Sequence, residues 1–294
     1  MTKENPFHKN YDSSIDAKLV CEILKGDKKS LEKLVKRIQG YIFNVALKMF
    51  NSIEDAEDTT QEVLVKVIAN LSKYDSTKSQ FRTWLYRMTV NHFLDFKKTK
   101  YEKSITNFSS FFGAIEDVPE MDLNDGDENA LLLLVEEAKV SCMAGMLMCL
   151  DREQRLIYII GEIFEIDHNI AGEIFQITPA NFRQKLSRTR KDLYQWMNNK
   201  CGLVNSANKC RCHKKTGGFI ANGWVNPDNM KWHSDYKQKI YKLSGEKIDQ
   251  LVSAWEDVYA NLYKDHPFKN YDTSETLLSK ILGNKTIRDN LNLN

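Results

Sequence analysis

The sequence has no uninterrupted apolar run that approaches the ~20 residues a membrane-spanning helix needs. Its first twelve residues are too polar for the hydrophobic segment of a secretory signal peptide. We therefore expect a cytoplasmic protein without membrane insertion. In that compartment the six cysteines are expected to be thiols or metal ligands rather than disulfides.

The sequence also lacks the motifs of common enzymes, because no carboxylate cluster, nucleophile elbow or glycine-rich phosphate loop stands out. A length of 294 residues allows two small globular domains with appendages. The net charge of +2 hides strong segregation, since residues 104–138 hold acids and no Lys or Arg, and residues 183–191 hold bases and no acid. Such blocks favour an acidic connector and a basic surface for nucleic acid, so we expect a protein that is not an enzyme.

What is present is helical periodicity, which predicts an all-α protein. After an N-terminal tail, 1–11, residues 12–103 read as a four-helix domain. Two helices with apolar faces lie within residues 13–50, and a third begins at Ser52, where Ser52 and Asp55 have the spacing of a capping box. A fourth helix runs from Phe81 to Lys98.

The third helix carries an acidic, solvated face in its first turns, formed by Asp55, Asp58, Gln61 and Glu62. Acidic residues near a helix start also complement the helix macrodipole, so ordinary stabilisation explains this cluster as well as a docking surface does. The composition of the fourth helix favours the docking surface. There Phe81, Trp84 and Leu85 form an apolar stripe, and aromatic, amide and basic residues fall outside it, where they suit DNA: Arg82, Tyr86, Arg87, Asn91, Lys97 and Lys98.

Residues 138–200 contain the most specific local signal, a predicted helix-turn-helix. A short helix over 169–175 is followed by a turn at Gln176, an N-cap at Thr178 and Pro179 in the first helical position. The second helix is basic. Its candidate DNA contacts are Thr178, Asn181, Phe182, Arg183, Gln184, Lys185, Arg188 and Arg190. The alternative is a basic amphipathic helix on the surface of a bundle.

Residues 104–137 lose periodicity and read as an acidic linker, which is a solvated spacer on composition alone. Residues 201–294 form a partly helical C-terminal extension, in which residues 248–262 around Trp255 have an apolar face. Its first part holds Cys201, Cys210, Cys212 and His213, which fit a structural zinc site, a reactive thiol or plain reduced cysteines. No other cofactor is expected.

Two ordered motifs resemble extracytoplasmic-function (ECF) sigma factors of the sigma-70 family. The sequences Glu57-Asp58-Thr59-Thr60-Gln61-Glu62-Val63 and Phe81-Arg82-Thr83-Trp84-Leu85-Tyr86-Arg87, with Asn91 and Asp95, resemble region 2 across most of residues 12–103. Residues from Leu150 to Lys191 resemble region 4. The pattern departs from the family at Gln176, where Gly is common, and at Arg87-Met88, where primary sigma factors carry a Trp pair.

The resemblance implies a subunit that binds core RNA polymerase and promoter DNA and directs transcription initiation. It implies that the acidic face of the third helix docks on the polymerase, and that Asn91 and its neighbours hold the melted minus-ten strand. It implies that Lys73, Tyr74 and Lys78 lie near a flipped-out base, and that Arg183 to Arg190 read the minus-thirty-five duplex. A separate anti-sigma protein is an open candidate for a further partner. The C-terminal extension is then expected to be regulatory, and a stand-alone helix-turn-helix regulator is the alternative.

Overall fold

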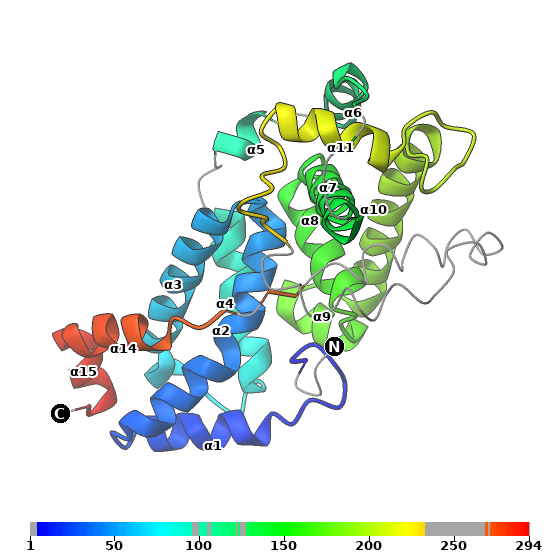
Figure 1. The fold of residues 1–294 in the computed structure, drawn as a ribbon. Helices are drawn as coiled ribbons and strands as arrows, with labels where there is room; N and C mark the ends of the chain where they lie inside the picture. The colour runs from blue at the N-terminus through cyan, green and yellow to red at the C-terminus, as the bar shows by residue number, and fades with distance from the viewer. Residues whose placement is uncertain are drawn as a thin grey trace. The chain divides into compact units, whose positions relative to one another are not determined.

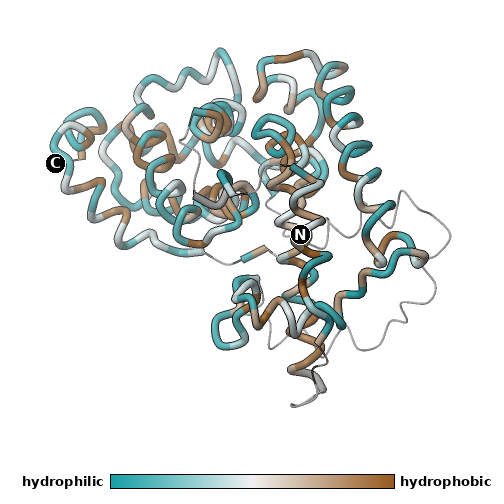
Figure 2. Tube along the Cα trace, turned by 90° about the horizontal axis from the view of Figure 1, so that it is seen from above, coloured by the Kyte–Doolittle hydropathy of each residue, from teal (hydrophilic) through white to brown (hydrophobic). Residues whose placement is uncertain are grey.

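The computed structural model describes residues 5–95, 100–104, 107–121, 123, 128–232, 268–269 and 271–293. Within these ranges the chain forms helices joined by turns, with no strand, so the all-α prediction is confirmed (Figure 1). Hydrophobic and hydrophilic residues alternate along most helices, as amphipathic packing requires (Figure 2). In the part of the chain covered by these ranges, no helix is long and apolar enough to cross a membrane.

The chain divides into two compact units, and each is built from segments far apart in the sequence. The first unit joins Met1–Thr99, Arg152–Leu186 and Asn270–Asn294, and the second joins Lys100–Asp151 and Ser187–Lys269. The helix-turn-helix segment therefore shares a unit with the N-terminal helices. The predicted boundaries at residues 103, 137 and 200 follow chain order instead, and they stay a prediction.

The four predicted N-terminal helices are all present in the first unit. They are α1 (Ser14–Ile23), α2 (Lys28–Phe50), α3 (Ile53–Ala69) and α4 (Phe81–Asp95), with a 3-10 turn η1 (Leu71–Lys73) after α3. Helix α2 ends at Asn51, whose left-handed conformation has φ of 52°. The Ser52 hydroxyl then accepts a hydrogen bond from the Asp55 N–H at 3.2 Å, which confirms the predicted start of α3.

The helix-turn-helix segment comprises α8 (Arg152–Tyr158), the π-helical turn η2 (Ile159–Ile163), α9 (His168–Phe175) and α10 (Pro179–Lys200). Helix α10 begins in the first unit and continues into the second. Two arginines tie α8 to the N-terminal helices: Arg155 donates to the Met49 carbonyl oxygen at 2.6 Å, and Arg152 donates to that of Phe93 at 3.1 Å. Since Arg155 is buried, these bonds fix α8 against the C-terminal ends of both α2 and α4.

The N-terminal segment before α1 also belongs to this core. Phe7 is fully buried, and its ring centroid lies 4.5 Å from that of Tyr86 and 5.5 Å from that of Phe164. The Asn5 side chain donates to the Phe164 carbonyl oxygen at 3.0 Å. A single short segment thus packs against both α4 and the end of η2.

The second unit contains α5 (Lys100–Ser104), α6 (Phe108–Asp117), α7 (Glu128–Met148) and α11 (Cys212–Ala221). Helix α6 lies where an aperiodic linker was expected, so that part of the linker prediction is wrong. Phe108 and Phe112 recur at helical spacing and stack on Trp196, with ring centroids 5.7 and 6.1 Å apart. The acidic composition of residues 104–137 concealed this short apolar stripe.

Two C-terminal helices, α14 (Ser274–Gly283) and α15 (Lys285–Leu291), belong to the first unit. The amphipathic helix expected over residues 248–262 lies outside the described residues.

Candidate polymerase and nucleic-acid interfaces

The first candidate surface is the acidic face of α3, formed by Asp55, Asp58, Gln61 and Glu62. Asp58 and Glu62 are exposed, and Asp55 and Gln61 are partly exposed. Their spacing of three and four residues places them on neighbouring turns of one helix face. The opposite face of α3 is buried. The structure therefore brings all four predicted docking residues together on an accessible surface.

His92 of α4 lies beside this surface, with its Nε2 atom 3.4 Å from the Glu62 carboxylate. Partial burial lowers the pKa of His92 and outweighs the attraction of Glu62 for the proton. The imidazole is therefore held toward its neutral form.

The second candidate surface, on α4, differs from the prediction at Arg82 and Tyr86. Tyr86 is only 1% exposed and packs against Phe7, and this burial raises the pKa of Tyr86 well above its usual value. Arg82 is buried too, and it donates to the His8 carbonyl oxygen at 2.9 Å and to that of Pro6 at 3.4 Å. The expectation that both side chains fall outside the core was wrong, because the N-terminal segment covers a face of α4 that periodicity alone left open.

Other polar residues of α4 contact the helix-turn-helix segment. The Arg87 guanidinium donates to the Glu173 carbonyl oxygen at 3.1 Å, and the Thr83 hydroxyl donates to the Glu173 carboxylate at 3.1 Å. Helix α4 packs along α9 over this stretch. Asn91 is exposed. Lys97 and Lys98 lie outside the described residues.

The remaining predicted minus-ten contacts lie at the end of η1 and in the loop between η1 and α4. Lys73 and Lys78 are exposed. Tyr74 is partly buried, since its ring packs on Phe81 and Trp84 at centroid distances of 5.5 and 5.6 Å. Its hydroxyl donates to the Ser79 carbonyl oxygen at 3.1 Å, which closes the loop.

The third candidate surface is the start of α10, where the predicted helix-turn-helix geometry is present. The Thr178 hydroxyl accepts from the Asn181 N–H at 3.2 Å, as an N-cap should. Gln176 takes the left-handed conformation, with φ of 55°, at the position where a glycine is common. A Cβ on Gly172 would lie 2.8 Å from the Ile177 carbonyl oxygen, so this glycine permits the tight turn.

Most predicted contacts on α10 point outward. The exposed residues are Thr178, Asn181, Arg183, Gln184, Arg188 and Arg190. Lys185 is partly exposed and pairs with the Glu153 carboxylate at 3.0 Å. Phe182 is fully buried beside Phe175, with ring centroids 5.5 Å apart, so it is a core residue and the expectation that it contacts DNA was wrong.

The cysteine cluster of the second unit does not support the zinc hypothesis. Among the residues in the described ranges, no group of three or more His, Cys, Asp or Glu side chains is placed to hold a metal ion. Burial raises the pKa of Cys201 and Cys210 and raises that of Cys212 to about 12, which keeps the thiols protonated. His213 is exposed. In this structure Cys201, Cys210 and Cys212 are free thiols.

Comparison with known proteins supports the family that the sequence motifs predict. The family model described as Sigma-70 region 2 matches residues 34–102, which include most of α2 and all of α3 and α4. The ECF RNA polymerase sigma factor SigW of Bacillus subtilis is 24% identical over 188 residues, which cover 60% of this chain and 93% of the relative. These matches support an ECF factor of the sigma-70 family.

Two further relatives agree with this assignment. The ECF RNA polymerase sigma factor SigM of Bacillus subtilis is 21% identical over 165 residues, covering 56% of this chain and 93% of the relative. The RNA polymerase sigma-H factor of Pseudomonas aeruginosa is 32% identical over 76 residues, covering 26% of this chain and 39% of the relative. These relatives indicate a sigma factor of transcription initiation.

Sequence reasoning missed several residues that organise this sigma factor. Phe7 was not singled out, although its apolar ring in a polar tail was a signal. Glu173 gave no signal, because its bonds to α4 join residues 83 and 87 to a helix far along the chain. Gln39 and Tyr271, which hold the C-terminal helices, were likewise hidden until the tertiary contacts were known.

Proposed function

We propose that this sigma factor docks on core RNA polymerase through α3 and directs the enzyme to promoters. The observation that carries the proposal is the acidic face of α3, whose four predicted residues share one accessible surface inside the stretch that matches Sigma-70 region 2. An acidic face of this kind suits a basic partner surface, which gives electrostatic complementarity.

Promoter recognition is divided between two surfaces in this proposal. The exposed cations and amides at the start of α10 read the minus-thirty-five duplex, with Arg183 and Gln184 near base edges and Arg188 and Arg190 on phosphates. Asn91 and the loop residues Lys73 and Lys78 contact the minus-ten strand. With Arg87-Met88 in place of a Trp pair, melting is weaker and promoter choice stricter than in primary sigma factors.

The contacts of α4 add a condition to this mechanism. Arg87 reaches the minus-ten strand only after its bond to the Glu173 carbonyl oxygen is broken. Separation of α9 from α4 would therefore precede full engagement of the minus-ten element. Binding of polymerase and promoter supplies the free energy for such a population shift.

Charge reversal on α3 tests the docking role. Asp58→Lys combined with Glu62→Lys should abolish binding to core polymerase, because both exposed carboxylates become cations. Helical content should not change, since exposed charges contribute about 0–1 kcal/mol to stability. The matched control, Asp228→Lys, reverses an exposed acid of the second unit and should bind at the wild-type level.

Binding is measured by copurification with core polymerase and by titration of a labelled chain. Wild-type affinity in the α3 double variant would exclude this face as the docking surface. Tight binding of promoter duplex without any polymerase would instead favour a stand-alone helix-turn-helix regulator.

A further inference from the structure

The C-terminal helices α14 and α15 cover part of the surface formed by α2 and α3. Helix α14 packs against α2 and α3, and α15 packs against α3 and η1 (Figure 1). Their apolar residues Leu277, Ile281 and Leu291 are fully buried. The contact is thus an extended apolar interface within the first unit, and it lies on the helices that match Sigma-70 region 2.

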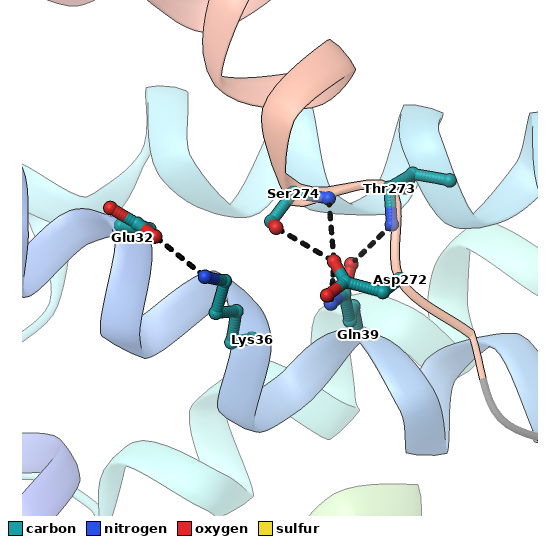
Figure 3. Close-up of polar contacts among 6 residues, drawn as sticks. All are labelled: Glu32, Lys36, Gln39, Asp272, Thr273 and Ser274. Carbon is teal, nitrogen blue, oxygen red and sulfur yellow. Dashed lines mark hydrogen bonds and ion pairs between the residues drawn. The ribbon is translucent and has the colours of Figure 1, made fainter.

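A polar bracket fixes the start of this tail on α2. The Gln39 side-chain amide donates to the Asp272 carboxylate at 3.0 Å, and its oxygen accepts from the Thr273 N–H at 3.2 Å (Figure 3). The same Asp272 oxygen accepts from the Ser274 N–H and hydroxyl at 3.0 and 2.7 Å, which lowers the pKa of Asp272 to about 2. Gln39 is only 2% exposed and Asp272 is exposed, so these hydrogen bonds lie at the edge of the buried face of α2.

An aromatic contact adds to this bracket. The Tyr271 ring stacks on Phe43 of α2, with parallel planes and centroids 4.1 Å apart. Stacked aromatic pairs contribute beyond their buried area. The sequence Asn10-Tyr11-Asp12 near the N-terminus is repeated in the tail as Asn270-Tyr271-Asp272. Tyr11 contacts Arg37 of α2, whereas Tyr271 stacks on Phe43. The two similar segments therefore occupy different places on α2, and the tail does not take the place of the N-terminal segment.

The tail reaches the acidic face of α3 itself. Lys280 of α14 donates to the side-chain oxygen of Gln61, one of the four predicted docking residues. The pKa of Tyr271 is raised, mainly by burial and in smaller part by the nearby carboxylates of Glu57 and Asp58. A partner that binds the acidic face of α3 would therefore contact the tail.

The far end of the tail is also anchored. The Asn292 side chain donates to the Leu24 carbonyl oxygen at 3.1 Å. A Cβ on Gly26 would lie 2.5 Å from the Asn292 carbonyl oxygen, so the turn between α1 and α2 leaves room for this close approach. Residues 271–293 are accordingly held at both ends and along their apolar side.

We propose that residues 271–293 act as an intramolecular competitor of core polymerase for the α2–α3 surface. The inference rests on the proposed docking role of α3. The tail-covered state binds polymerase weakly, and polymerase binding releases the tail, because both require the surface around Gln61. Coupling of this kind between two binding events typically changes affinity by about 5- to 150-fold.

The test compares full-length variants in which only the tail is changed. Leu277→Asp with Ile281→Asp places two charges in the buried contact and should release the tail. The matched control, Thr276→Asp with Ser279→Asp, places the same charges on exposed positions of the same helix. A milder variant, Tyr271→Ala with Asp272→Ala, removes the stack and the bracket without charging the core.

Two measurements are made on each chain. Titration with core polymerase gives the dissociation constant. It should fall by about 5- to 150-fold in the two variants that release the tail (the release variants), Leu277→Asp with Ile281→Asp and Tyr271→Ala with Asp272→Ala, and stay at the wild-type value in the control. Hydrogen exchange reports protection of amides in α14 and α3. In the wild-type chain, added polymerase should raise exchange in α14 and lower it in α3.

The outcomes separate this inference from the proposed function. Equal affinities for all chains, with α14 exchange raised in the release variants, would overturn the inference and leave the docking role intact. If the amides of α14 stay protected from exchange when the wild-type chain is saturated with polymerase, the inference is likewise overturned and the docking role stays intact. Failure of every variant to bind polymerase would overturn both, and hydrogen exchange of the free chain would still show whether the tail contact forms.

Discussion

Helices α4 and α10 carry the two predicted DNA surfaces, and the structure presents them in opposite ways. On α10, Arg183, Gln184 and Arg190 are exposed. On α4, Arg82 and Tyr86 are buried. Both helices are rich in basic and aromatic residues, so composition alone does not distinguish them.

The difference follows from what each helix packs against. Helix α10 buries one narrow stripe, which includes Phe182 and Leu186, and leaves the rest of its first turns to solvent. Helix α4 is covered by the N-terminal segment and by α9 in addition to α3. The predicted minus-thirty-five surface is therefore open, and the predicted minus-ten surface is partly closed.

The largest expected effect is on stability, at Tyr86. Tyr86→Ala removes a fully buried ring that packs on Phe7, so the free energy of unfolding should fall by about 3–5 kcal/mol. Urea unfolding followed by circular dichroism measures this change. Arg183→Ala, at an exposed position, is the control and should stay within about 0.5 kcal/mol of wild type. A small loss at Tyr86 would mean that its ring is free to meet DNA, and the contrast between α4 and α10 would disappear.

A smaller effect is expected on DNA binding by α10. If Arg183 reads a base, Arg183→Ala should cost about 1–3 kcal/mol on the cognate site and little on a mutated one. Arg190→Ala should weaken binding to all sequences and reduce the salt slope by about one. The polymerase holoenzyme is titrated with promoter fragments at several salt concentrations. Losses of equal size on every sequence for both variants would remove Arg183 from the base-reading role.

The smallest effect concerns the contact between α4 and α9. Glu173→Ala removes the acceptor of the Thr83 hydroxyl and should lower the free energy of unfolding by about 0.5–1.5 kcal/mol. Glu173→Gln keeps an acceptor and serves as the control. The Arg87 bond to the backbone oxygen should survive in both variants. If the two substitutions change stability equally, the Thr83 hydrogen bond does not hold α9 in place.

Local features were predictable because they depend on neighbouring residues. The capping box at Ser52, the N-cap at Thr178 and the helical spacing of the α3 acids involve positions three or four residues apart. The acidic connector was misread for a related reason, since its composition outweighed a short stripe that includes Phe108 and Phe112. Buried positions on α4 were misassigned because its covering segment lies far away in the sequence.

The sequence by itself determined the helices, their caps, the order of the two sigma-like motifs and the acidic face of α3, since each rests on local hydrogen bonds and helical periodicity. Only the tertiary structure decided which of those surfaces are open. Phe7 and the pair Arg82 and Tyr86 became core, and Tyr271 with α14 came to lie beside Gln61, through contacts between segments separated by tens to hundreds of residues. Helical periodicity does not predict these long-range contacts, because they depend on which apolar faces pack together when the whole chain folds.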